Sequence, residues 1–251
     1  MLQNILIKPA SGLCNMRCDY CFYCDEATKR NIPSYGMMEE KTIKNIIRKV
    51  LRQNVKNVCF AFQGGEPTLH GLDFFKKVIE LENQYNTHHC SILNSLQTNG
   101  LCIDENWCSF FKKHNFLVGV SVDGIESVHN LYRHDKNEQG TYHRIRENIK
   151  LLEKYNVEYN ILTVVNRQSC RKHQNKFTKE YRENGWNYQQ YILCLDLWGN
   201  SKVKKEYSLT PEIYGQFLID LFQLWYKDWR RNRAPYIRQF ENYIGILLGY
   251  P

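Results

Sequence analysis

Apolar positions in this chain alternate between the spacing of strands and the spacing of helices. Short runs rich in apolar and β-branched residues, each about one strand long, recur at about residues 4–9, 57–63, 90–97, 116–122, 157–165 and 187–195. After the first run, Ile43, Ile47 and Val50 repeat with the spacing of one helix face. The same spacing predicts further helices from about residue 74 and near 104–114, 141–155, 171–184 and 211–230.

This alternation predicts an α/β fold with a parallel sheet and right-handed crossovers. Six strand–helix units without a separate second run of strands fit a partial (β/α)6 barrel, and an open doubly wound sheet is the alternative. Both architectures place functional residues after the carboxyl ends of the strands.

Polar segments of unusual composition follow the first four predicted strands. Their positions are the cysteine-rich segment 14–24, and then 63–67, 97–100 and 121–124. By contrast, the segments that enter the strands, such as 53–57, are ordinary polar loops. The sequence therefore predicts a functional site at one rim of the sheet.

Composition narrows the class of protein. The 251 residues are 43% hydrophobic and 24% charged, which is typical of a globular domain and excludes collagen-like or wholly disordered chains. No run approaches the roughly 18–20 apolar residues of a membrane span, and the amino terminus lacks signal-peptide features. We expect a cytoplasmic protein with no membrane partner. The net charge is +8, but its charges are scattered, so nucleic acid is not an expected partner.

Cysteine usage gives the most specific signal. The chain has ten cysteines, and without a secretion signal they do not indicate a disulfide framework. Cys14, Cys18, Cys21 and Cys24 lie within eleven positions. Three thiolates in the pattern Cys14-x-x-x-Cys18-x-x-Cys21 would hold a four-iron cluster with one iron open to a further ligand. A fourth sulfur from Cys24 would instead permit a closed, structural zinc site.

The zinc alternative corresponds to a zinc-stabilised binding module. Such sites usually combine one Cys-x-x-Cys with a second Cys or His pair. The nearest candidates, His88 and His89, precede the third predicted strand, at the opposite end from the cysteines. We therefore expect these histidines to be surface residues.

The cysteine pattern, with Tyr20 before its last cysteine and Gly-Gly-Glu-Pro after the second strand, resembles the radical S-adenosylmethionine (SAM) superfamily. Within it, segments 6–10, 20–23, 61–69, 94–100 and 118–124 resemble the anaerobic sulfatase-maturating enzymes. The resemblance extends from Leu6 to the aromatic stretch near Trp225. It implies a partial (β/α)6 TIM-like barrel of the radical SAM type.

The resemblance also implies the cofactors and the residues that bind them. Cys14, Cys18 and Cys21 would ligate a 4Fe-4S cluster, whose remaining iron takes the amino and carboxylate groups of SAM. The matching SAM-binding positions are Tyr20, Gly65, Glu66, Ser121, Arg133 and Leu195.

Five of these six positions have an expected role. Tyr20 would lie near the adenine, and Gly65, lacking a Cβ, would let the backbone approach the methionine moiety. Glu66 suits an ammonium group and Arg133 a carboxylate, whereas Leu195 would form an apolar wall. Taken singly, a tyrosine such as Tyr20 would usually be a core residue, and Arg133 could be a surface ion pair.

In the implied reaction the cofactor supplies the chemistry. Reductive cleavage of SAM gives a 5′-deoxyadenosyl radical, which in the resembled enzymes oxidises a Cys or Ser of a sulfatase polypeptide to formylglycine. Tyr23, Gln63 and Gln97 match positions near that peptide. A low-potential electron donor, flavodoxin or ferredoxin, is the other implied partner. The alternative within the superfamily is maturation of another ribosomal peptide.

One part of the family pattern has no counterpart here. The resembled enzymes carry a cysteine-rich, SPASM-like C-terminal domain with two auxiliary 4Fe-4S clusters and an aspartate general base. We therefore expect residues 1–230 to form the core barrel and 231–251 to begin a linker towards that domain. No catalytic residue is assigned, because the base would lie beyond Pro251.

Overall fold

The computed structural model describes residues 2–53, 55–171, 174–196 and 205–250. They form two compact units that interleave along the sequence. The first comprises the chain up to Met16, Glu26–Gly119 and Arg144–Tyr159, and the second comprises Arg17–Asp25, Val120–His143 and the chain from Asn160 onward.

The first unit contains a parallel sheet in the order β1-β3-β4. Strands β1 (Leu2–Ile7) and β3 (Asn57–Phe62) are in register from one end to the other, so Ile7 pairs with Phe62. Strand β4 (Ser91–Thr98) pairs with β3 so that Phe62 lies opposite Leu96. The carboxyl ends of all three strands are therefore level.

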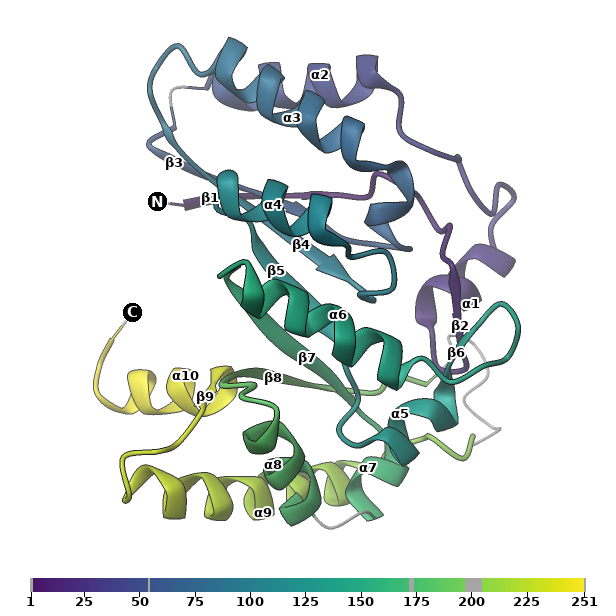
Figure 1. Ribbon diagram of the computed structural model, residues 1–251, viewed down its shortest axis with the longest axis vertical. Helices are drawn as coiled ribbons and strands as arrows, with labels where there is room; N and C mark the ends of the chain where they lie inside the picture. The colour runs from purple at the N-terminus through teal and green to yellow at the C-terminus, as the bar shows by residue number, and fades with distance from the viewer. Residues whose placement is uncertain (1, 54, 172–173, 197–204, 251) are drawn as a thin grey trace. The chain divides into compact units, whose positions relative to one another are not determined.

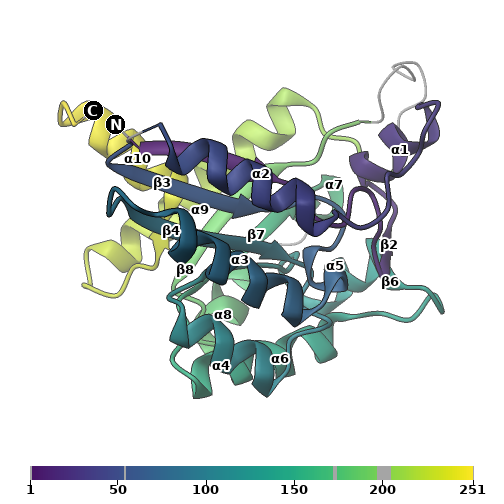
Figure 2. The same cartoon turned by 90° about the horizontal axis from the view of Figure 1, so that it is seen from above.

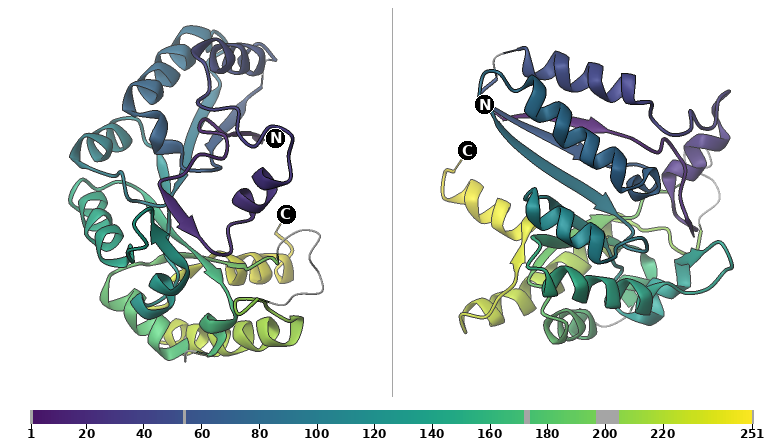
Figure 3. Two further views of the ribbon diagram at one scale, coloured as in Figure 1. Left: turned by 90° about the vertical axis from the view of Figure 1, so that its right-hand side faces the viewer. Right: turned by 45° about the horizontal axis from the view of Figure 1, so that its top comes forward.

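Helices α2 (Glu40–Leu51) and α3 (Leu72–Tyr85) lie side by side along this sheet (Figures 1 and 3). Ile43 and Ile47 are fully buried, as the predicted helix face requires. Phe62 and Phe75 meet edge to face, with ring centroids 5.2 Å apart. The unit also contains η1 (Pro67–His70), α4 (Glu105–Lys113) and most of α6 (Tyr142–Lys154).

The second unit is built on the parallel order β7-β8-β9. These strands are β7 (Tyr159–Val165), β8 (Tyr188–Leu193) and β9 (Tyr236–Ile237). Its helices are α5 (Glu126–Tyr132), α7 (Arg167–Arg171), α8 (Gln174–Glu183), α9 (Pro211–Trp229) and α10 (Arg238–Leu247). Helix α9 begins as predicted, because the Thr210 hydroxyl accepts from the Ile213 amide and Pro211 occupies the first turn.

Short elements carry the cysteines. Strand β2 (Met16–Cys18) lies beside β6 (Arg133–Asp135) in a separate two-stranded sheet (Figure 2). Helix α1 (Phe22–Thr28) follows directly after Cys21. Strand β5 (Leu117–Ser121) ends just before Asp123.

The six predicted strands are confirmed, each within two or three residues at its ends. The predicted helix near 171–184 is divided into α7 and α8, and residues 172–173 lie outside the described part. Elements α1, β2, α5, β6, β9 and α10 were not predicted. In the segment expected to begin a linker, β9 pairs with β8 and α10 follows it. Among the described residues, no helix is long and apolar enough to cross a membrane.

Candidate functional site

Glu66 links the ends of β3 and β4 in the first unit. It is buried, and its Oε1 accepts hydrogen bonds from the Thr68 amide (3.0 Å) and from the hydroxyls of Thr68 (2.7 Å) and Thr98 (2.8 Å). Its Oε2 accepts from the Asn99 amide at 2.7 Å. Burial raises the pKa of Glu66 and these donors oppose that rise. The expected contact of Glu66 with an ammonium group stays a prediction. The contacts described here show that Glu66 holds the turn after β3 to the end of β4.

The local packing of the chain requires a glycine at position 65. Its φ is 56°, and a Cβ at this position would lie 2.3 Å from the carbonyl oxygen of Leu13. The next amide, that of Glu66, donates to the same oxygen at 2.8 Å. The Gly-Gly-Glu turn therefore packs directly on the segment that leads into Cys14, whether or not it also approaches a cofactor.

The Cys14 sulfur lies among N–H donors. The Met16 amide is 3.4 Å and the Asn99 Nδ2 3.6 Å from Sγ. Asn99 is oriented by the Asn15 Oδ1, to which its Nδ2 donates at 2.7 Å. N–H donors stabilise a thiolate, which is the form that ligates a metal. The sequence placed Asn99 at the rim but gave it no role.

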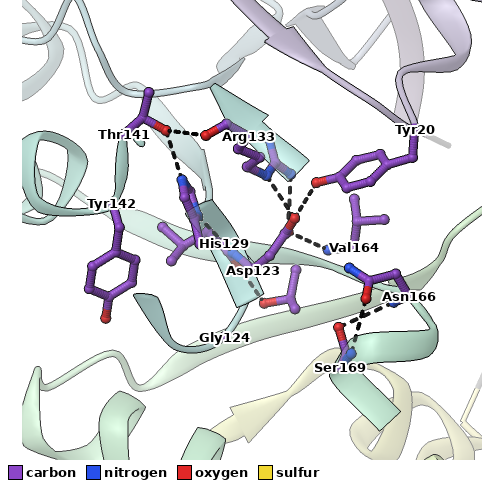
Figure 4. Close-up of polar contacts among 12 residues, drawn as sticks. Tyr20, Asp123, Gly124, His129, Arg133, Thr141, Tyr142, Val164, Asn166 and Ser169 are labelled. Carbon is purple, nitrogen blue, oxygen red and sulfur yellow. Dashed lines mark hydrogen bonds and ion pairs between the residues drawn. The ribbon is translucent and has the colours of Figure 1, made fainter. Parts of the chain in front are cut away.

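A buried ion pair dominates the site in the second unit. Arg133 donates from Nε to Asp123 Oδ2 at 2.8 Å and from Nη2 to Oδ1 at 3.1 Å. Figure 4 shows the Tyr20 hydroxyl directed at the same carboxylate, to which it donates. Burial alone would raise the pKa of Asp123, but the guanidinium holds it below its usual value. Arg133 is thus a buried partner of Asp123 and not the surface ion pair considered above.

His129, together with Thr141, links the backbone of Asp123 to the backbone of Arg133. The Asp123 amide donates to His129 Nδ1 at 3.2 Å, so the proton of the neutral ring lies on Nε2. That Nε2 is 2.9 Å from the Thr141 hydroxyl, which donates onward to the Arg133 carbonyl (Figure 4). Burial lowers the pKa of His129 to about 3, with a further contribution from Arg133, so the ring stays neutral.

Cys18 and Cys21 lie beside this network. Cys18 packs against an aromatic cluster of Tyr20, Tyr132 and Tyr207, whose rings meet edge to face. The Cys21 amide donates to the Cys18 carbonyl at 3.0 Å. A hydrogen bond from the Cys24 side chain lowers the pKa of Cys21 to about 6, despite partial burial.

The remaining predicted residues also lie near the carboxyl ends of strands. Ser121 ends β5 and is half-buried, and Leu195 follows β8 and is exposed. Gln63 follows β3 and Gln97 lies near the end of β4, both half-buried. Tyr23 lies on α1 with its ring 4.1 Å from that of Phe22. Their assignment to SAM or substrate stays a prediction.

The donor set suits an iron–sulfur cluster. Cys14, Cys18 and Cys21 carry thiols that form no disulfide, and the surroundings of Cys14 and Cys21 favour the thiolate. In the described part of the chain, no three Cys, His, Asp or Glu side chains gather around a single-ion site. In a four-iron cluster each cysteine binds a different iron, so its ligands need not meet at one ion. His88 and His89 are exposed before β4, as expected.

Gly124, which follows Asp123, packs closely against α8. Its φ is 70°, and a Cβ would lie 1.5 Å from the Phe177 ring of α8. Its amide donates to the Tyr181 hydroxyl at 3.0 Å. The residue after Asp123 is therefore packed against α8 of the second unit.

Comparisons with known proteins show the family and the fold. The profile of the Radical SAM superfamily matches residues 9–169. A cysteine-type anaerobic sulfatase-maturating enzyme of Clostridium novyi is 45% identical over 98% of this chain and 66% of its own length. A serine-type enzyme of Bacteroides thetaiotaomicron is 31% identical over 89% of this chain and 57% of its own length. The chain thus spans slightly under two thirds of the first relative and less of the second.

A solved structure gives the same result for the fold. Native anSMEcpe with bound AdoMet and Kp18Cys peptide aligns with a TM-score of 0.93 and 42% identity, covering 100% of this chain and 67% of that one. This agreement confirms the expected α/β fold, and the partial barrel is compatible with it. Together with the superfamily match over residues 9–169, it establishes that the chain belongs to the radical SAM superfamily.

Proposed function

We propose that this chain is the core of an anaerobic sulfatase-maturating enzyme, which oxidises a residue of a sulfatase polypeptide to formylglycine. In this proposal Cys14, Cys18 and Cys21 hold a 4Fe-4S cluster. With SAM bound, such a cluster would supply 5′-deoxyadenosyl radical chemistry, and a low-potential donor such as flavodoxin or ferredoxin would supply the electron. The 45% identity to a cysteine-type enzyme, against 31% to a serine-type one, supports cysteine as the target residue.

One observation carries the proposal. Three cysteines have the superfamily spacing, and two N–H donors, the Met16 amide and the Asn99 Nδ2, lie near the sulfur of Cys14. N–H donors favour the thiolate, which is the form that iron–sulfur clusters require.

In this proposal the other residues bind and orient SAM and the peptide, and they exclude water from the cysteine loop. Glu66 holds the turn at the end of β3 against β4, which fixes the backbone on which the methionine moiety would lie. The aromatic cluster of Tyr20, Tyr132 and Tyr207 shields one side of Cys18. Tyr23, Gln63 and Gln97 would contact the sulfatase peptide, and Ser121 and Leu195 the nucleoside part of SAM.

The test begins with anaerobic reconstitution with iron and sulfide. We expect about four irons per chain and a brown protein, and we expect Cys18→Ala to lose the cluster. Cys108→Ala, which removes a buried thiol remote from the motif in sequence, is the control and should retain it. A colourless protein with one tightly bound zinc would refute the proposal and support the zinc module.

The second step tests substrate class. The loaded chain is incubated with dithionite, SAM and a Cys-x-Pro-x-Arg peptide, and the products are analysed by mass spectrometry. We expect 5′-deoxyadenosine as the product of SAM cleavage. Cleavage stimulated equally by an unrelated peptide would favour maturation of another ribosomal peptide.

A further inference from the structure

The Asp123 carboxylate collects donors from three separate segments. Besides Tyr20 and Arg133, the Val164 amide of β7 donates to its Oδ1 at 2.9 Å. Asp123 is fully buried, and its own amide is held by His129. Its position is therefore fixed through both backbone and side chain.

Two of its partners are residues expected to touch SAM. Tyr20 lies between Cys18 and Cys21 in the sequence, so fixing its ring restricts the loop that carries both sulfurs. Arg133 stacks over the Tyr20 ring, with its guanidinium carbon 5.5 Å from the centroid. Asp123 engages two of the five N–H donors of this guanidinium.

We propose that Asp123 is a positioning residue, whose buried carboxylate orients Arg133 towards the carboxylate of SAM and holds Tyr20 and the Cys18–Cys21 loop in place. This inference rests on the proposed function. The role is indirect, because Asp123 acts through Arg133 and Tyr20. His129 and Thr141 complete the arrangement by tying the Asp123 amide to the Arg133 carbonyl.

The same unit offers a matched control. Asp228 is also a carboxylate with two guanidinium partners, Arg182 at 2.6 Å and Arg233 at 2.9 Å. Neither partner is among the residues expected to bind a cofactor. The two arginine partners of Asp228 are about half exposed, so Asp228→Asn shows the effect of losing a carboxylate–guanidinium contact away from the expected SAM site.

The experiment compares both variants with the reconstituted wild type. Iron per chain, unfolding temperature, the dissociation constant of SAM by equilibrium dialysis and the EPR spectrum of the reduced cluster with and without SAM are measured. We expect Asp123→Asn to keep its iron, to bind SAM at least about tenfold more weakly and to lose most of the SAM-induced EPR change. Asp228→Asn should bind SAM like the wild type, even if it unfolds at a lower temperature.

A second pair of variants guards against simple misfolding. Asp123→Asn combined with Arg133→Gln removes both buried charges, so its unfolding temperature should rise above that of Asp123→Asn while SAM binding stays weak. Tyr20→Phe keeps the ring and the ion pair, and should weaken SAM binding less than Asp123→Asn does.

Three results would overturn the inference. They are SAM affinity of Asp123→Asn within twofold of the wild type, an equal loss in Asp228→Asn, or full recovery of SAM binding in the double variant. If the wild type itself takes up no cluster or no SAM, the proposed function fails, and the inference fails with it.

Discussion

Glu82 allows a direct test of how burial changes the pKa of a carboxyl group, and through it the stability of this protein. It lies on α3 and is only 4% exposed, and its Oε2 accepts from Asn94 Nδ2 of β4 at 3.0 Å. Among the described residues, Glu82 Oε1 and Asn94 Oδ1 have no hydrogen-bond partner. Burial raises the pKa of Glu82 to about 7 from an ordinary value of 4.5.

The perturbation is Glu82→Gln, which keeps the shape and the acceptor for Asn94 but cannot ionise. Because the pKa of Glu82 is raised in the folded state, the contribution of Glu82 to stability is largest below about pH 4.5. It is lost as the pH rises from there through about 7, and the loss then levels off. The difference between about 7 and 4.5 corresponds to about 3 kcal/mol. The variant should therefore be more stable than the wild type by about 3 kcal/mol near pH 8.5 and by about 1 kcal/mol near pH 5.

Urea denaturation followed by fluorescence at the two pH values measures this difference. Glu80→Gln on the same helix is the control, since Glu80 is exposed and pairs with Lys77 at 3.0 Å. Its effect should stay within about 1 kcal/mol at both pH values. A Glu82→Gln variant that is no more stable than the wild type near pH 8.5, or whose gain does not depend on pH, would refute the reasoning.

Three further predictions concern the site. Gly65→Ala should lower the free energy of unfolding by about 1–3 kcal/mol and reduce iron uptake. Gly71 also has a positive φ, 87°, but open space for a Cβ, so Gly71→Ala should lower the free energy of unfolding less and leave iron uptake unchanged. Equal losses in the two variants would contradict the close approach at Gly65. Since burial lowers the pKa of His129 to about 3, the contribution of His129 to stability should fall as the pH drops from about 6.5 towards 3, by up to about 1.4 kcal/mol per pH unit. In urea titrations His129→Gln should remove that contribution, and a variant with the same pH dependence as the wild type would contradict it. Cys24→Ala should leave the iron content unchanged but raise the pKa of Cys21 in the cluster-free chain. Peptide mapping would show this rise as slower alkylation of Cys21 at neutral pH. Loss of one iron in the variant would instead show that Cys24 is a ligand.

The main strands and helices could be predicted because each is long enough to show a period. Strands β2 and β6 have three residues each, and α5 has seven, so none repeats an apolar spacing more than once. The rim of the site was predictable for a related reason, since parallel strands bring their carboxyl ends level.

The partners within the site were not predictable in the same way. Asp123 followed by Gly124 is typical of a turn, and nothing local indicates that its carboxylate is buried against Arg133. Its hydrogen bond with Tyr20 joins residues 103 positions apart. Such pairs depend on the packing of strands that meet only in the folded chain, and a single sequence does not show them.

The enclosure of the Asp123–Arg133 pair has a practical consequence. Mobile ions screen charges at the surface far more than charges inside a protein. Exposed pairs such as Lys76 with Asp73 will weaken in concentrated salt, but the pair beside Tyr20 will not. This cationic chain can therefore be washed free of adsorbed polyanions at high ionic strength without loosening the support of its cysteine loop.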